Sequence, residues 1–252
     1  MLQEFLALNI FAVLLIFARL GAAISFMPGF SVAYVSGRMR LGIALTMSVA
    51  LAPVLGPNLP VLPPNLPDLA ILLVGEIIVG SFFGILARIL VSSLQTAGTV
   101  IALSSAMANA LIQDPVAEQQ SSTVSGFLLT MGIVLIFVTD MHHLMFRAVV
   151  ESYDVFPPGL RVPAGDLADM IARKVSDSFI LGVQMATPAI VVGMTYYIGL
   201  GLLGRLMPQL PVFFFGLPIQ VTLQLWVLTL TISGIMLVFT QRFQENMAAF
   251  VR

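Results

Sequence analysis

The chain has 252 residues, of which 59% are hydrophobic and only 9% are charged, and its mean hydropathy is +1.04. Because soluble globular domains carry about 25% charged residues, this composition is that of a membrane protein and excludes the soluble classes. The net charge of −1 offers no basic surface for a phosphate backbone, which argues against a nucleic-acid partner. The absence of cysteine excludes disulfide bonds and cysteine-ligated metal centres.

The start of the chain does not have the pattern of a cleaved secretory signal. Such a signal begins with positive charge and a short apolar region, whereas residues 1–4 carry a negative charge and the apolar run reaches residue 30. We therefore expect a retained membrane helix here. Further apolar stretches cover residues 41–55, 69–111, 124–146, 178–204 and 212–240.

The stretch 69–111 is too long for one simple crossing, because about 20 helical residues span a bilayer core of about 30 Å. Its polar cluster at residues 92–99 predicts a hairpin turn, although no proline enforces one. A single crossing would separate Arg38 and Arg40 from the later positive charges, whereas a hairpin puts all of them on one side. The positive-inside rule favours the hairpin, with an extracytoplasmic N-terminus and a cytoplasmic C-terminus.

Three connections between the apolar stretches differ from one another in composition. Residues 56–68 are rich in proline, which predicts a stiff, non-helical spacer. Residues 113–122 form a polar insertion. Residues 151–177 form a charged loop and then an amphipathic helix, which continues into the next apolar stretch with Pro188 as a predicted kink.

Charged residues inside apolar stretches are functional candidates, because placing a charge in lipid costs about 2.5–3.5 kcal/mol. We expect them to pair with another helix or with backbone carbonyls inside a bundle; a proton or ion relay and a role at a pore are the alternatives. Glu76 and Arg88 are too far apart to pair on one helix. The five candidates are Arg19, Glu76, Arg88, Asp140 and Arg205.

His142 and His143 follow Asp140 and suggest a metal site. Neighbouring helix positions point about 100° apart, however, so we expect a helix end at the membrane boundary and no metal. We find no nucleophile with a matched base and no phosphate-binding glycine loop, so we expect no enzyme and no cofactor. Gly80 and Gly84 form a small-xxx-small pair, which predicts close helix packing.

Residues 201–218, GLLGRLMPQLPVFFFGLP, resemble the signature of the FliR family, the flagellar member of the type III secretion export gate. Residues 19–28, 37–53 and 142–159 resemble further family segments in the same order, so the resemblance covers nearly the whole chain. Met141 and Met207 depart from the family pattern. The motif positions that the resemblance makes structurally important are Arg19, Pro28, Arg40, Pro53, Pro208, Gln209, Gly216 and Pro218.

The resemblance implies an all-α, polytopic helical membrane protein with long, partly kinked helices and helical hairpins, packed mainly against partner subunits. Residues 1–252 would form a single FliR-like membrane domain. Its implied function is that of a core subunit of the bacterial flagellar type III export gate, in the inner membrane at the flagellar basal body. FliP-like and FliQ-like subunits would complete the channel for unfolded flagellar subunits, beside FlhB-like and FlhA-like export components.

Two other functions remain open at this point. A small-molecule or ion secondary transporter should show paired half-helices and internal symmetry, neither of which is clear in the sequence. A non-transporting membrane scaffold is the third reading. Co-purification with FliP-like and FliQ-like subunits would distinguish a gate subunit from both.

The resemblance maps the family's plug loop, which closes the export channel, onto residues 109–122. Val116 replaces the usual glycine and the segment has no phenylalanine. Polar side chains can exchange hydrogen bonds with water at low cost, which suits a plug that must open. The candidate plug residues are Asn109, Gln113, Asp114, Pro115, Glu118, Gln119, Gln120, Ser121 and Ser122.

Overall fold

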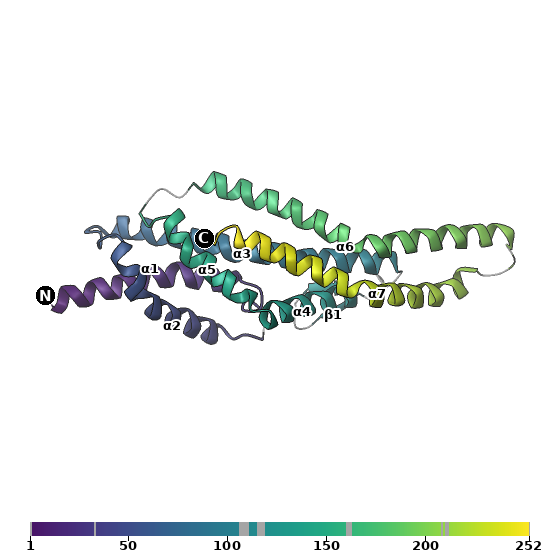
Figure 1. Ribbon diagram of the computed structural model, residues 1–252, viewed down its shortest axis with the longest axis horizontal. Coiled ribbons are helices and arrows are strands. Elements are labelled where there is room, and N and C mark those ends of the chain that lie inside the picture. Colours follow the sequence, from purple (N-terminus) through teal and green to yellow (C-terminus); the bar gives the residue numbers. More distant parts are fainter. Residues whose placement is uncertain are drawn as a thin grey trace. The chain divides into compact units, whose positions relative to one another are not determined.

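The computed structural model describes residues 2–32, 34–105, 111–114, 119–159, 163–207, 209 and 212–251. These residues form helices and one pair of short strands (Figure 1), which confirms the all-α class. The elements are α1 (Leu2–Phe26), α2 (Gly37–Leu55), the 3-10 turn η1 (Gly56–Asn58), α3 (Leu66–Ser104), β1 (Leu111–Asp114), β2 (Gln119–Ser122), α4 (Thr123–Val138), α5 (Met141–Val155), α6 (Ala164–Leu206) and α7 (Val212–Ala248).

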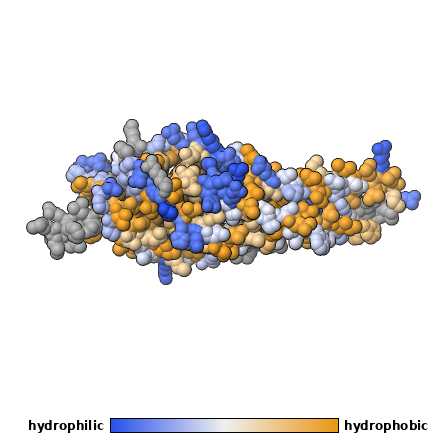
Figure 2. All heavy atoms as spheres, in the orientation of Figure 1, coloured by the Kyte–Doolittle hydropathy of each residue, from blue (hydrophilic) through white to orange (hydrophobic). Residues whose placement is uncertain are grey.

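Long apolar helices dominate the described part of the chain. Four segments are long and apolar enough to cross a membrane, and the bent pair α4–α5 makes a fifth candidate. These four are Gly37–Asn58, Leu66–Ser104, Ala164–Leu206 and Phe214–Ala248. Hydrophobic residues cover much of the surface seen in Figure 2. The predicted polytopic membrane protein is therefore confirmed.

The chain divides into two compact units. Unit 1 comprises Met1–Ile89, Asp140–Lys174 and Gln244–Arg252, and unit 2 comprises Leu90–Thr139 and Val175–Phe243. Helices α3, α6 and α7 each contribute residues to both units. The single-domain organisation of residues 1–252 stays a prediction.

In unit 1, α1 packs against α2 and α3. A Cβ atom added at Gly84 would lie 2.5 Å from the Ala23 carbonyl oxygen, and one added at Gly80 would overlap the Arg19 carbonyl. Only glycine permits this approach of the α1 and α3 backbones, so the close packing predicted from the small-residue pair is confirmed. Near the end of the chain, the Phe250 ring meets the Phe83 ring edge-on at 5.3 Å.

In unit 2, α6 and α7 form a helical hairpin, as the fold prediction required (Figure 1). The Tyr196 hydroxyl of α6 donates a hydrogen bond to the Gly216 carbonyl of α7 at 2.7 Å. Gly216 also lies against Leu200, where a Cβ would come within 2.7 Å of a leucine methyl. Pro188 lies inside α6 at the predicted position, and Pro218 lies inside α7.

The predicted hairpin within residues 69–111 is wrong, because α3 is one continuous helix of 39 residues. Its polar cluster does not break it, since the hydroxyls of Ser93, Thr96 and Thr99 donate to carbonyls of their own helix. Hydroxyl groups satisfied in this way are compatible with a helix interior. The predicted membrane orientation, with an extracytoplasmic N-terminus, depended on that hairpin and therefore no longer has support.

The proline-rich spacer is shorter than predicted. It begins with η1, and α3 already starts at Leu66 with Pro67 in its first turn. Proline is tolerated there because the first backbone N–H groups of a helix have no intrahelical partner. The helix predicted in residues 151–177 corresponds to the start of α6, which has 43 residues and continues through the apolar stretch; its amphipathic character stays a prediction.

Candidate functional site

The candidate plug segment contains an antiparallel hairpin. β1 pairs with β2, so that Leu111 is opposite Ser122 and Asp114 is opposite Gln119. A two-stranded hairpin is marginally stable by itself in water, so its ordering depends on what holds its two ends. Of the predicted plug residues, Gln113, Asp114, Gln119, Gln120, Ser121 and Ser122 lie in these strands, whereas Asn109, Pro115 and Glu118 lie outside the described residues.

The C-terminal end of the segment is bound to α3 through Ser122. This buried residue caps α4, because its Oγ accepts a hydrogen bond from the Ser125 backbone N–H at 3.1 Å. The same hydroxyl faces the Gly98 carbonyl at 3.4 Å, and the Ser125 hydroxyl donates to the Gln95 carbonyl at 3.1 Å. Gly98 has no space for a Cβ, because the Ser125 backbone nitrogen would lie 2.8 Å from it.

The last turn of α3 precedes the candidate plug in the chain, and residues 106–110 between Ser105 and β1 lie outside the described residues. The Gln220 side chain of α7 donates from Nε2 to the Ser104 carbonyl at 2.9 Å. The Ser105 hydroxyl donates to the Ile101 carbonyl at 2.8 Å, and Ser105 is fully buried. Among the described residues, the candidate plug itself is hydrogen-bonded to α3 through Ser122, and Gln220 of α7 holds the end of α3 that precedes it.

Sequence reasoning missed Gln220 and its neighbour Gln224. Both side chains are buried, and Gln224 donates from Nε2 to the Ala189 carbonyl of α6 at 2.9 Å. The available signal was two amides four residues apart within an otherwise apolar stretch, since polar side chains in such stretches normally face a protein interior.

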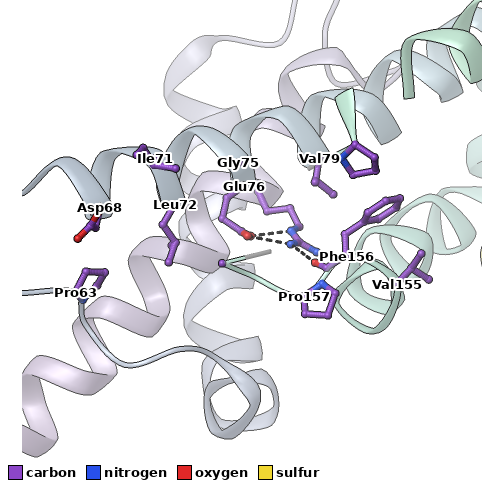
Figure 3. A pocket seen from close by; sticks show the side chains of 13 residues that line it. Pro63, Asp68, Ile71, Leu72, Gly75, Glu76, Val79, Val155, Phe156 and Pro157 are labelled. Atoms are coloured by element: carbon purple, nitrogen blue, oxygen red, sulfur yellow. Dashed lines mark hydrogen bonds and ion pairs between the residues drawn. The ribbon is translucent and has the colours of Figure 1, made fainter. Parts of the chain in front are cut away.

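In unit 1, Arg19 and Glu76 form a buried two-bond ion pair (Figure 3). Arg19 donates from Nε to Glu76 Oε2 at 2.7 Å and from Nη2 to Glu76 Oε1 at 3.0 Å. Nη1 donates to the Ser152 hydroxyl at 3.0 Å, and Nη2 also donates to the Phe156 carbonyl at 2.8 Å. The guanidinium carbon lies 3.8 Å above the centre of the Tyr153 ring, close enough for a cation–π contact.

This arrangement joins α1, α3 and the C-terminal end of α5 at one point. Arg19 is 1% exposed and Glu76 is 2% exposed, so their charges compensate each other out of contact with solvent. Such a pair must keep its geometry, because an uncompensated buried charge is strongly unfavourable. The prediction that these charges pair with another helix inside the bundle is therefore confirmed for Arg19 and Glu76.

A cavity of about 420 Å³ lies beside the ion pair. Its wall is mostly apolar and includes Leu72 of α3 and Phe156 and Pro157 after α5 (Figure 3). The ion pair lines one part of it and Asp68 another. Arg19 and Glu76 are hydrogen-bonded to each other, and Arg19 is also hydrogen-bonded to the end of α5. This geometry supports a role in helix packing rather than in proton transfer.

The other three intramembrane charges are exposed in this chain. They are Arg88 of α3, Asp140 before α5, and Arg205 in the last turn of α6. A cation near a helix C-terminus interacts favourably with the helix dipole, which accounts for Arg205. A partner or a pore role for these three stays a prediction.

The argument that His142 and His143 cannot face one ion is wrong in this structure. Their ring centroids lie 4.1 Å apart, and potential ligand atoms of Asp140 and both histidines lie within 4.8 Å of one another. Both histidines lie in the first turn of α5, which begins at Met141 after the left-handed Asp140 with φ 58°, and their rings lie close together although adjacent helix positions diverge. A helix boundary does lie here, because α4 ends at Val138 and α5 begins at Met141. Its location at the membrane boundary stays a prediction.

Two observations still argue against a metal at this position. The side chains of Asp140 and His143 are 77% and 68% exposed. The positive end of the α5 dipole also disfavours a cation. The absence of a metal stays a prediction.

Several of the remaining motif positions have structural contacts in the described part of the chain. Arg40 donates from Nε and Nη2 to the Val35 carbonyl at 3.2 and 3.0 Å, which ties α2 to the turn before it. Pro28 lies in the turn after α1, next to Gly29, whose φ of 83° favours glycine. Pro53 lies inside α2.

In the segment between α6 and α7, Gln209 is exposed, and Pro208 lies outside the described residues. Gly216 has the contacts given above. Pro218 begins a turn of α7 in which its carbonyl accepts a hydrogen bond from the Thr222 hydroxyl at 2.9 Å.

Comparison with known proteins agrees with these features. The sequence model of the family described as "Bacterial export proteins, family 1" matches residues 10–246. The chain is similar to the Flagellar biosynthetic protein FliR of Caulobacter vibrioides, with 36% identity over 244 residues and 97% of each chain covered. It is similar to FliR of Escherichia coli, with 30% identity over 81% of this chain and 77% of that protein.

A relative with a different printed name also matches. The Yop proteins translocation protein T of Yersinia pestis is 27% identical over 185 residues, which cover 72% of this chain and 70% of that protein. The family match includes the residues that form the ion pair and those that hold Ser122 and the end of α3. This chain therefore belongs to the bacterial export proteins, family 1, and the resemblance to its FliR members is confirmed.

Proposed function

We propose that this chain is a core subunit of the bacterial flagellar type III protein export gate and forms part of the inner-membrane channel for unfolded flagellar subunits. The observation that carries this function is the match to a flagellar biosynthetic protein over 97% of both chains. The apolar helices support a multi-pass membrane protein, and the flagellar relatives support a location in the inner membrane at the flagellar basal body. The longer and closer match to FliR than to the translocation protein favours the flagellar system.

The partners in this proposal are FliP-like and FliQ-like subunits of the gate, with FlhB-like and FlhA-like export components beside them. In support, large apolar side chains on α7 are exposed in the single chain, among them Phe214, Trp226 and Leu230. Protein surfaces of this kind are covered by lipid or by other subunits in a membrane assembly. The chain acts here as a channel component, without a catalytic, cofactor or metal site.

Residues 109–122 are the proposed plug. A channel wide enough for a polypeptide would leak ions unless its resting state were closed. The segment suits this role because it is polar and because Ser122 attaches its C-terminal end to α3, while Gln220 of α7 holds the end of α3 that precedes it. It can thus be held closed locally and released without unfolding the surrounding helices.

Complementation tests the function. A bacterium that lacks this chain should assemble no flagellum and export no flagellar subunits, and the wild-type chain should restore both. The complex purified through a tag on the chain should contain FliP-like and FliQ-like subunits. A secondary transporter would instead purify alone or as a homo-oligomer, and its loss would leave export intact.

A further inference from the structure

Three helices of unit 2 meet at the C-terminal end of α3, which precedes the candidate plug in the chain. Gln220 and Gln224, four residues apart on α7, are 0% and 1% exposed. Gln220 reaches the Ser104 carbonyl in the last turn of α3, and Gln224 reaches the Ala189 carbonyl of α6, both at 2.9 Å. Only the NH₂ end of a glutamine can bond to a carbonyl oxygen, so the chemistry fixes the orientation of both amides.

Gly193 of α6 lies at the centre of this junction. A Cβ added there would lie 3.0 Å from the Ser104 carbonyl oxygen and 2.9 Å from Nε2 of Gln224. The missing side chain therefore makes room for the end of α3 and for the second glutamine at once. A methyl group at this position would press against both contacts.

The Ser104 carbonyl belongs to the last turn of α3, where carbonyls lack an N–H partner within their own helix. Gln220 supplies the missing donor from α7. Neither glutamine side-chain oxygen has a hydrogen-bond partner among the described residues. A buried acceptor without a partner raises the free energy of the hydrogen-bonded junction. The junction therefore holds α3 through one donor, and this contact can still be released.

We propose that Gln220 and Gln224 form a latch that positions the candidate plug. Gln220 holds the end of α3 from which the segment departs, and Gln224 fixes α7 against α6 beside Gly193. Release of Gln220 from Ser104 frees the last turn of α3, while Ser122 keeps the C-terminal end of the candidate plug on α3. This assignment rests on the proposed role of residues 109–122.

Thiol labelling of the assembled gate tests the latch. The chain has no cysteine, so a Ser105→Cys substitution creates a single, nearly isosteric probe at a fully buried position directly after α3. We expect Gln220→Leu and Gln220→Met, neither of which can donate to the Ser104 carbonyl, to raise the labelling rate of this thiol about tenfold. That factor corresponds to the loss of about one buried hydrogen bond.

Thr222→Val is the matched control. It removes a hydrogen bond from the same helix, but Thr222 is exposed and bonds only to its own helix at the Pro218 carbonyl. Its labelling rate should equal that of the parent. Gly193→Ala retains both glutamines and should raise the rate, because the added methyl displaces the end of α3.

Unchanged labelling in both Gln220 variants would overturn the latch. Failure of both variants to assemble with the other gate subunits would also overturn it, because the glutamines are assigned to positioning and not to assembly. Labelling reports on the end of α3 directly. A wrong assignment of the plug would appear separately, as a deletion of residues 109–122 that causes no ion leakage.

Discussion

Arg19 and Glu76 are joined by two hydrogen bonds, from Nε at 2.7 Å and from Nη2 at 3.0 Å, although neither side chain contacts solvent. The pair connects α1 with α3, and the bonds of Arg19 to Ser152 and Phe156 extend the connection to α5. The geometry of the pair selects one alignment of these helices. Apolar contacts alone would define that alignment less narrowly.

Removal of one partner of this pair should destabilise the chain more than removal of both. Arg19→Met or Glu76→Leu leaves an uncompensated buried charge, for which we expect a loss of about 3–5 kcal/mol in the free energy of unfolding. The double variant should recover part of that loss. The check is thermal unfolding in detergent together with the amount of assembled gate, and a double variant as unstable as the sum of the singles would contradict the account.

Gly80→Ala should separate α1 from α3. The new methyl group would overlap the Arg19 carbonyl, so we expect a destabilisation of about 1–3 kcal/mol, typical of overpacking. Gly42→Ala is the control, because an added Cβ there meets no atom of the described chain within 4 Å. Denaturation midpoints of the two variants should differ; equal midpoints would show that the backbones do not approach so closely.

Ser122→Ala should weaken the C-terminal attachment of the candidate plug. Loss of the α4 cap should cost about 1 kcal/mol and raise resting ion leakage modestly, whereas Ser122→Asp should keep the cap. Thr130→Val is the control on the same helix, since its exposed hydroxyl bonds only to the Gly126 carbonyl. Leakage that rises as much in the control as in Ser122→Ala would refute this role.

Metal removal should have no effect. Chelation of divalent cations from the purified complex should leave its unfolding temperature and its export activity unchanged, as expected for exposed Asp140 and His143 side chains. The decisive comparison is with His143→Ala: a zinc-dependent rise in unfolding temperature that this substitution abolishes would establish a metal site.

Sequence patterns identified the membrane class and the candidate charges, because both follow from the cost of placing polar groups in lipid. They did not identify the partner of Arg19, since Glu76 is distant in sequence and the contact depends on how α1 packs against α3. The hairpin predicted in residues 69–111 failed because a polar cluster resembles a turn, although Ser93 and its neighbours satisfy their hydroxyls inside a helix.

Gln220 and Gln224 escaped notice for a related reason. Averaged over residues 212–240, the stretch is apolar, and two amides do not change that average. Their function depends on which carbonyls face them, and these carbonyls come from α3 and α6. The β1–β2 hairpin was likewise unpredicted, because a short polar segment carries little alternation of apolar and polar residues.

The most direct test of the account is the ion conductance of the assembled gate after deletion of residues 109–122. A gate subunit whose channel is closed by this segment should still assemble, but the variant complex should conduct ions at rest, and cells that carry it should grow slowly in salt. An assembled variant complex with the resting conductance of the wild type would contradict the central claim.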